Sequence, residues 1–197
     1  MKGIISKDRA EKNISRYEGW IEEVAERYSI PKAAIKAILF KEMTMIDIMD
    51  VFADLVVLTR LFGKKDSSTG YAQIFGKTGL DAVNFAEDHG LSDREKLGLG
   101  KGPRLDRTNI NDIRKVWRLL RSDRRANIEI ASLNILSAAE EMTGRTDFGS
   151  FSEEELKLVF TRYNANTKKI TPYGEDVYRH FLRYGGRQGS AEADPGQ

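Results

Sequence analysis

The residue best suited to chemistry is Glu42, a carboxyl group placed among apolar residues. A helix that begins after Pro31 turns by about 100° per residue and puts Glu42 in the middle of an apolar stripe. The members of this stripe are Ile35, Ile38, Leu39, Met45, Ile46 and Met49. Burial without a partner disfavours the ionised form and raises the pKa, which suits a group that donates a proton near neutral pH. Two structural explanations of a glutamate at this position are equally good. Glu42 pairs with a distant Arg or Lys, or it lies where the helix emerges into water.

A buried general acid suits the cleavage of glycosidic bonds. Protonation of the bridging oxygen lets one sugar leave while positive charge develops on the other ring. A second carboxylate normally activates water or traps the sugar. Asp66, in the polar stretch 64–70, is the first candidate for this second role, and Asp50 is the next. Each of these aspartates, taken alone, is explained better by a structural role.

Several other chemistries find no support in the sequence. The chain has no cysteine, which excludes disulfides and thiolate metal sites. Its two histidines, His89 and His180, belong to no helical ligand motif, so we expect no metal site. The glycine-rich stretch 98–103 does not fit a phosphate-binding loop and is interpreted as a connector. We therefore expect no metal, nucleotide or organic cofactor.

The elements that must position these residues are predicted to be mainly α-helical. Apolar residues recur at spacings of three and four, whereas alternating runs with hairpin turns are scarce, so little or no β-sheet is expected. Ser29 to Pro31 indicates a break and a restart, with Ser29 or Ile30 near the cap of the following helix. The predicted helices cover about 8–28, 32–61 with a bend near Thr44, 78–87, 109–120, 124–142, 152–163 and 173–182.

Length and composition predict a single domain. The chain has 197 residues, of which 40% are hydrophobic, enough to bury one sizeable core. We expect this domain to span 1–184 and the Gly-, Ser- and acid-rich end, 185–197, to be disordered. No stretch is apolar over about 18 residues, and the first residues lack a signal peptide, so neither a membrane span nor a leader is expected. The protein is then made in the cytoplasm.

The overall charge is close to neutral, with 32 Lys and Arg against 30 Asp and Glu and a net charge of +2. Nucleic acid is therefore not the expected partner. Basic residues do gather between Arg104 and Arg125, where they could face an anionic polymer. A solvated helix face is the simpler explanation of these residues.

Four sequence fragments that contain or follow Glu42 occur in a recognisable order. Residues 37–42 read Ala-Ile-Leu-Phe-Lys-Glu and end an apolar helix. Residues 67–75 read Ser-Ser-Thr-Gly-Tyr-Ala-Gln-Ile-Phe, a Gly-x-x-Gln-hydrophobic pattern. A helix over 127–142 and the sequence Phe-Thr-Arg-Tyr-Asn-Ala at 160–165 follow.

This order resembles the soluble lytic transglycosylase and goose-type lysozyme superfamily, over roughly Ile30 to Tyr184. The chain departs from the pattern in three places, which indicates a divergent branch. Met43-Thr44 follow the glutamate where the family usually has Ser, and the section 45–61 is longer and more apolar than the family's. Asn166 stands where Gly is common.

The resemblance implies a lysozyme-like helical fold with a substrate cleft between lobes. It implies that Glu42 is the general acid acting on the β-1,4 bond between N-acetylmuramic acid and N-acetylglucosamine in peptidoglycan. Hydrolysis and ring closure to a 1,6-anhydro sugar both remain open, and an unclear second carboxylate favours the latter. By the same matching, Gly70 shapes the cleft, Gln73 positions Glu42 or the sugar, and the remaining substrate-binding residues are Tyr71, Tyr163 and Asn164.

This interpretation also implies where the protein acts. Peptidoglycan glycan strands would be the substrate, reached in the periplasm or outside the cell after export or lysis. A secretion machinery or an immunity protein would then be a further partner. Two alternatives stay open: a non-catalytic module of the same fold that binds glycan or protein, and a helical DNA-binding protein that uses the Arg-rich helix.

Overall fold

The computed structural model describes residues 5–45 and 68–187 of the chain. This part is mainly helical with one small two-stranded sheet, as predicted. Its elements are α1 (Lys7–Arg16), α2 (Glu18–Tyr28), α3 (Lys32–Met45), β1 (Ser68–Thr69), β2 (Ile74–Phe75), α5 (Gly76–Asp88), α6 (Ile110–Ser122), α7 (Arg124–Thr143), a 3-10 turn (Phe148–Ser150), α8 (Glu153–Asn164) and α9 (Pro172–Arg183).

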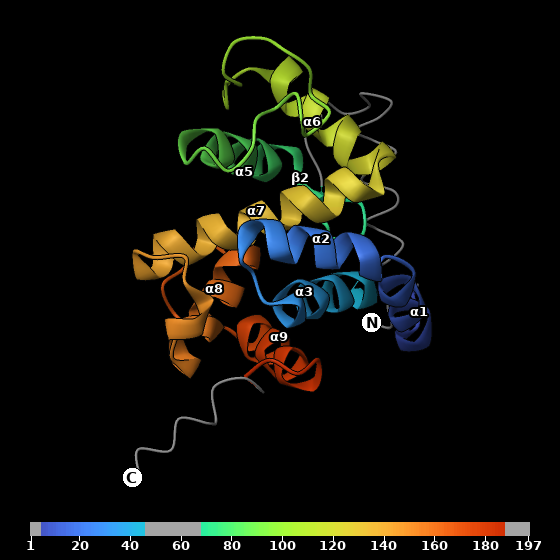
Figure 1. Ribbon diagram of the computed structural model, residues 1–197, viewed down its shortest axis with the longest axis vertical. Coiled ribbons are helices and arrows are strands. Elements are labelled where there is room, and N and C mark those ends of the chain that lie inside the picture. The colour runs from blue at the N-terminus through green and yellow to red at the C-terminus, as the bar shows by residue number, and fades with distance from the viewer. Residues whose placement is uncertain (1–4, 46–67, 188–197) are drawn as a thin grey trace.

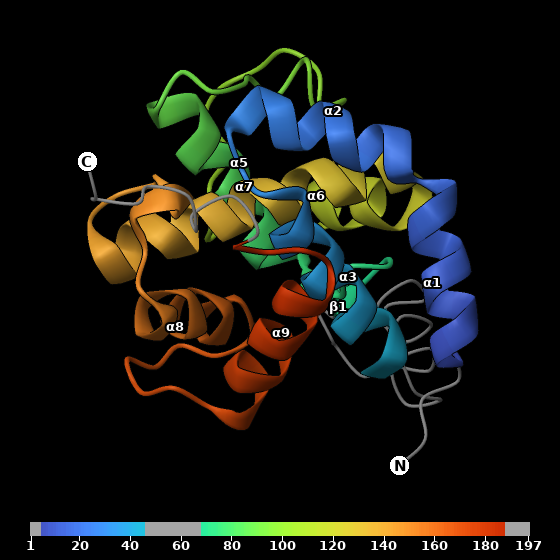
Figure 2. The same cartoon turned by 60° about the horizontal axis from the view of Figure 1, so that its bottom comes forward.

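Helix α3 lies at the centre of the fold, where α1, α2, α7 and α9 contact it (Figure 2). Between Ala33 and Met43, every residue of α3 except Lys36 and Lys41 is buried. The helix is therefore surrounded by protein, and its apolar positions extend beyond the single predicted stripe. Within that stripe Ile35, Ile38 and Leu39 are buried as expected. Met45 is half-exposed, so its predicted burial is wrong, and Ile46 and Met49 lie outside the described residues.

Helix α7 separates the two halves of the fold (Figure 1). On one side α5 and α6 pack against it, and on the other α2, α3 and α8 do. Its buried Glu129 ties it to α2, because the Glu129 Oε1 atom accepts hydrogen bonds from Arg27 Nη1 at 2.6 Å and from the Tyr28 hydroxyl at 2.7 Å. Charged and hydrogen-bonded partners of this kind are what a buried carboxylate requires.

The sheet is a short antiparallel hairpin that leads directly into α5. Ser68 pairs with Phe75, and Thr69 pairs with Ile74.

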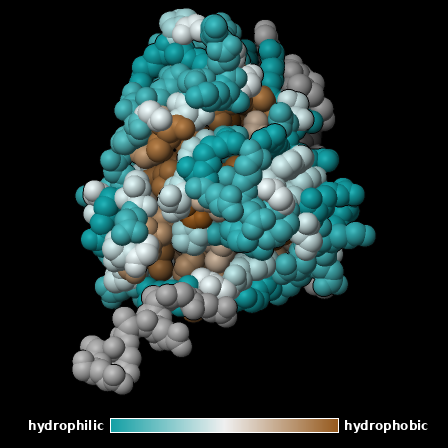
Figure 3. Space-filling view, viewed as in Figure 1, coloured by the Kyte–Doolittle hydropathy of each residue, from teal (hydrophilic) through white to brown (hydrophobic). Residues whose placement is uncertain are grey.

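The space-filling view shows hydrophilic residues over most of one face, with hydrophobic residues in the hollows between them (Figure 3). Within the described ranges, no helix combines the length and apolar character needed to cross a membrane.

The first predicted helix, 8–28, is wrong as a single element. It is interrupted at Tyr17, which ends α1 and precedes α2 with φ −103° and ψ 14°. Both helices show a helical hydrophobic period, and the period alone does not show that the axis changes direction between them. Ser29 also differs from the prediction, because it ends α2 in the left-handed conformation at φ 54°, and α3 starts directly after Pro31.

The later helices lie within a few residues of their predicted bounds. Asn109, Asp123, Ser152 and Thr171 each accept a hydrogen bond from a backbone N–H of the first turn, which explains where α6, α7, α8 and α9 begin. The predicted disordered tail is wrong at its start. Gly186 is buried and its N–H donates to the Phe181 carbonyl at 2.9 Å, so the fold extends to residue 187. Residues 188–197 lie outside the described part.

Helices α8 and α9 approach each other closely at Gly174. A Cβ atom there would lie 2.5 Å from the Lys157 carbonyl oxygen and would overlap the Thr161 hydroxyl. We expect Gly174→Ala to lower the free energy of unfolding by about 2–3 kcal/mol, because backbone would have to move to relieve the overlap. Urea unfolding followed by circular dichroism measures this change.

Gly19→Ala is the matched control, because a Cβ at Gly19 in α2 meets nothing within 4 Å. This variant should gain up to about 0.5–1 kcal/mol, since alanine loses less backbone entropy than glycine on folding. Equal urea midpoints for the two variants would show that the contact between α8 and α9 is not tight.

Candidate active site

Glu42 is buried near the end of α3, with 6% of its surface exposed. Its Oε1 atom accepts a hydrogen bond from the hydroxyl of Tyr173, in the first turn of α9. Glu42 and Tyr173 are 131 positions apart in the chain, so the fold creates this contact. A carboxyl group on a buried helix is thereby held by a neutral donor.

Two tyrosine hydroxyls stay protonated beside Glu42. Burial raises the pKa of Tyr173 well above its ordinary value, and the charge of Glu42 raises it further. Burial and the same charge raise the pKa of Tyr163 in α8. The Tyr163 hydroxyl donates to the Ala72 carbonyl at 2.9 Å, which ties the hairpin to α8. Both phenols are therefore hydrogen-bond donors over the whole physiological pH range.

A salt bridge adjacent to Glu42 also joins α3 to α9. Lys41 Nζ lies 2.7 Å from Asp176 Oδ2, and the ammonium group lies 5.9 Å from the ring centre of Tyr173. Burial by itself raises the pKa of Asp176, but hydrogen bonds from Lys41 and Arg179 outweigh it and lower the pKa to about 2. Helix α9, which carries Tyr173, is thus joined to α3 both by this salt bridge and by the hydrogen bond to Glu42.

Gly70 and Asn127 fix the hairpin turn against α7. Gly70 has a φ of +73°, and a Cβ at this position would overlap the Asn127 side chain and lie 2.8 Å from the Leu120 carbonyl oxygen. The buried Asn127 accepts a hydrogen bond from the Ala72 N–H at 3.0 Å. The close loop packing that the family resemblance implied for Gly70 is therefore present.

Gln73 closes the same turn. Its Nε2 atom donates to the Gly70 carbonyl at 2.8 Å, and its Oε1 atom accepts from the Ser68 hydroxyl at 3.1 Å. Gln73 itself has a φ of 43°, a conformation that non-glycine residues adopt rarely. Its side chain is engaged within the hairpin while it also lines the cavity described next.

A cavity of about 290 Å³ brings Glu42 together with three of the predicted substrate-binding residues, Gln73, Tyr163 and Asn164. Its walls come from the hairpin, α5, α7, α8 and the segments that follow α5 and α8. The other lining residues are Ile74, Phe75, Thr78, Asp81, Arg107, Asn134, Ser137, Arg162 and Asn166. Amide and hydroxyl groups therefore surround a buried carboxyl group.

Gly70 and Tyr71 do not line this cavity. The Tyr71 ring packs against Tyr17, with 5.8 Å between ring centres, and the Arg124 guanidinium lies 5.5 Å from its centre. The predicted role of Tyr71 in substrate binding has no support in this placement. Asp50 and Asp66, the predicted second acids, lie outside the described residues.

Asp81, an acidic residue of α5 that no sequence pattern singled out, lines the same cavity. Its Oδ2 atom lies 2.8 Å from Arg107 Nε. Burial raises the pKa of Asp81, and the charge and hydrogen bond of Arg107 oppose this rise. A single Asp on an amphipathic helix carries no signal of a partner 26 positions away, so the sequence offered no means to identify it.

A larger cavity, of about 520 Å³, contains the other buried glutamate of the described chain, Glu129. The Glu129 carboxylate is paired with the Arg27 guanidinium at 2.6 Å. A carboxylate held by a permanent cation is poorly suited to donate a proton. Size alone therefore does not make this cavity the better candidate for acid catalysis.

Metal ligands do not cluster in the part of the chain that the structure describes. His89 contacts the Phe85 carbonyl and Glu140 on the surface. His180 packs on Phe40, with 4.6 Å between ring centres. Both histidines thus have ordinary structural surroundings.

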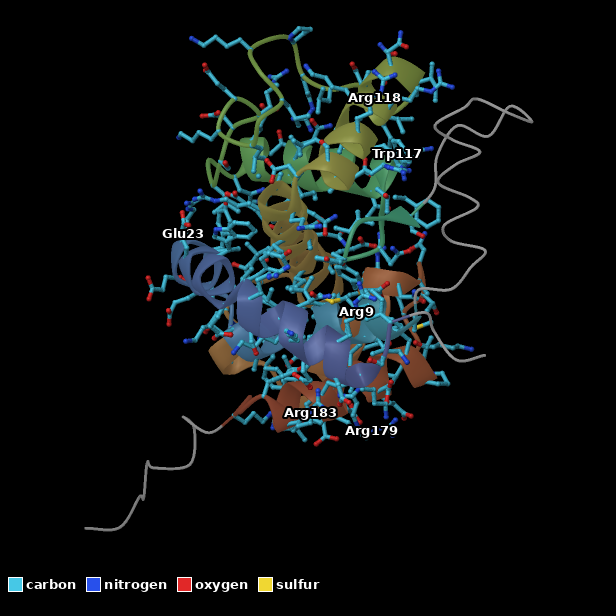
Figure 4. The ribbon with its side chains drawn as sticks, turned by 90° about the vertical axis from the view of Figure 1, so that its right-hand side faces the viewer. Arg9, Glu23, Trp117, Arg118, Arg179 and Arg183 are labelled. Carbon is cyan, nitrogen blue, oxygen red and sulfur yellow. The ribbon has the colours of Figure 1, made fainter. Side chains whose placement is uncertain are left out.

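The basic residues are dispersed over the molecule (Figure 4). Arg118 lies at one end, on α6, whereas Arg9, Arg179 and Arg183 lie toward the other, on α1 and α9. Within the predicted basic stretch, Arg125 pairs with Glu23 at 2.6 Å. This distribution gives no specific support to the DNA-binding alternative.

No protein-family model, curated protein or solved structure matches the chain.

The Lys41–Asp176 pair predicts a pH-dependent stability. Because the folded-state pKa of Asp176 is lowered from 3.8 to about 2, the stabilisation is present above pH 4 and is lost as pH falls through 2. Asp176→Asn should lower the free energy of unfolding by about 1–2 kcal/mol at pH 7. The difference from the wild type should shrink by about half at pH 3.

Urea unfolding at several pH values measures this difference. Asp88→Asn is the control, since Asp88 also pairs with an arginine, Arg104, but on the exposed surface. If the stability difference between Asp176→Asn and the wild type did not change with pH, this would contradict the lowered pKa of Asp176.

Proposed function

We propose that the protein is a glycosidase that cleaves the β-1,4 bond between N-acetylmuramic acid and N-acetylglucosamine in peptidoglycan, with Glu42 as the general acid. The observation that carries the proposal is a buried Glu42, bonded to the Tyr173 hydroxyl, that lines a polar cavity. The order of motifs that resembles the lytic transglycosylase and goose-type lysozyme superfamily supports the choice of substrate.

The proposed reaction begins with transfer of the Glu42 proton to the bridging oxygen. The bond between this oxygen and C1 breaks, and its electron pair stays with the departing sugar. Positive charge then develops on the ring that retains C1. The hydrogen bond from Tyr173 stabilises the carboxylate that forms.

A nucleophile must then attack C1, and two nucleophiles are available. In hydrolysis, water attacks C1 and gives a proton back to Glu42. In ring closure, the 6-hydroxyl of the same sugar attacks C1 and loses its proton to Glu42, which yields a 1,6-anhydro product. Asp81, the other carboxylate among the described cavity residues, is engaged by Arg107. Ring closure needs no second carboxylate, and this favours ring closure over hydrolysis.

The cavity lining suits a sugar chemically. Amide groups of Gln73, Asn134 and Asn164 offer donors and acceptors that match hydroxyl and acetamido groups. Phe75 lines the same cavity with 48% of its surface exposed. An exposed ring among polar groups provides an apolar surface for the face of a sugar ring.

Glu42→Gln tests the acid role. The variant should release soluble fragments from dye-labelled peptidoglycan sacculi at least about 100-fold more slowly than the wild type, because an amide has no proton to donate. Its circular dichroism spectrum and urea midpoint show whether the fold is kept. A folded variant with wild-type release would remove Glu42 from the reaction.

Tyr173→Phe tests the positioning of Glu42. Losing the hydroxyl should reduce kcat about 10-fold or more with little change in KM, and should shift the basic limb of the pH–rate profile, which reports loss of the Glu42 proton, to higher pH. Tyr178→Phe, on the same helix and bonded to Glu153 instead, is the matched control. An unchanged pH profile in a slow Tyr173→Phe variant would mean that the hydroxyl acts only on structure.

Phe75→Ala tests the sugar-stacking surface. Losing about 50 Å² of apolar contact should raise KM about 5- to 10-fold while kcat changes little. Leu182→Ala, which removes an exposed apolar side chain outside the cavity, should leave KM unchanged. Equal effects of both substitutions would argue against contact between Phe75 and the substrate.

A further inference from the structure

Arg107 lies on the segment between α5 and α6 and lines the cavity that contains Glu42. Its side chain is 60% exposed, yet its orientation is constrained, because Nε contacts Asp81 Oδ2 at 2.8 Å. Among the described residues, the two terminal NH₂ groups of Arg107 have no hydrogen-bond or ion-pair partner. A guanidinium group held at one nitrogen thus keeps its remaining donors available to a ligand at the cavity.

The cation with donors still available at the cavity is Arg107. Two arginines, Arg107 and Arg162, and two carboxyl groups, Glu42 and Asp81, line the cavity. Arg162 pairs with Glu141 at 2.8 Å, outside the lining, whereas Arg107 contacts Asp81 through Nε. A carboxylate on the substrate can therefore bind the terminal donors of Arg107.

We infer that Arg107 determines specificity by binding a carboxylate of the glycan substrate, with Asp81 as the residue that positions it. Parallel N–H donors of a guanidinium match the two oxygens of a carboxylate, and charge assistance makes such hydrogen bonds strong. The inference rests on the proposed glycosidase function and assigns an additional residue to the same site. The carboxylate belongs either to an acidic substituent of the sugar or to a peptide attached to it.

A second Arg–Asp pair provides a matched control. Arg104 lies on the same segment and binds Asp88, on the same helix as Asp81, with Nη2 at 2.8 Å from Oδ2. Both pairs hold the segment to α5, but Arg104 does not line the cavity. A loss caused by loosening of the segment should appear in both variants, whereas a loss of carboxylate binding should appear only at Arg107.

The test compares Arg107→Gln, Arg107→Lys and Arg104→Gln on three substrates. These are intact peptidoglycan, glycan strands freed of peptides by an amidase, and chitin oligosaccharides, which carry no carboxylate. Arg107→Gln should lose about 10- to 100-fold in kcat/KM on carboxylate-bearing substrates and less than about 3-fold on chitin oligosaccharides. Arg107→Lys should recover part of the loss, and Arg104→Gln should match the wild type.

The substrates also identify the source of the carboxylate. A loss confined to intact peptidoglycan assigns it to the peptide. A loss confined to stripped strands assigns it to the sugar, whose lactyl carboxyl is bound in an amide until the amidase frees it. A loss on both means that Arg107 binds either carboxylate. Equal losses on all three substrates, or no loss on any, would overturn the inference while Glu42-dependent turnover continued.

Binding measurements separate this inference from the proposed reaction. Calorimetry in the Glu42→Gln background compares stripped glycan fragments with chitotetraose, with and without Arg107→Gln. A loss of affinity restricted to the acidic fragments supports the role of Arg107 even if no substrate is cleaved. Equal affinities with and without Arg107→Gln, or no binding of the acidic fragments, would overturn it.

Discussion

The candidate site depends on the hydrogen bond between Tyr173 and Glu42. A carboxyl group near the end of a central helix is buried, and such a group is costly to bury without hydrogen-bond partners. Helix α9 supplies Tyr173, and the Lys41–Asp176 salt bridge anchors the same helix one position before Glu42. Gly174 allows α8 to lie against α9, which brings Tyr163 to the same site. The geometry of the acid is therefore set by the C-terminal helices.

The rest of the cavity is built on α7, which separates the two halves of the fold. Its buried Asn127 holds the hairpin turn at Gly70, and this turn places Gln73 and Phe75 at the cavity. Helix α5 then follows the hairpin directly and carries Asp81 to the same wall, where it orients Arg107. Groups from both sides of α7 thus meet at one place, with an acid on one side and a fixed guanidinium on the other.

Local patterns were sufficient to predict the helical class and most ends of the later helices, because period and capping residues act over a few positions, but they left a buried and an emerging Glu42 equally open. They did not predict the break at Tyr17, the packed residues 185–187 or the exposure of Met45. Of the residues chosen by motif matching, Gln73, Tyr163 and Asn164 line the cavity with Glu42, whereas Tyr71 packs against Tyr17. Tyr173, Asn127 and Asp81 acquire their roles from partners far along the chain, and no local signal marks such pairs.

The most direct test of glycan cleavage by Glu42 is mass spectrometry of the soluble products that the purified protein releases from peptidoglycan sacculi, compared with a Glu42→Gln sample. Acid catalysis by Glu42 predicts muropeptides from the wild-type protein alone, ending either in a 1,6-anhydro sugar or in a reducing N-acetylmuramic acid. The first ending would establish ring closure and the second hydrolysis. Fragments produced by cleavage of peptide bonds, equal release by both proteins, or no release by either would contradict the central claim.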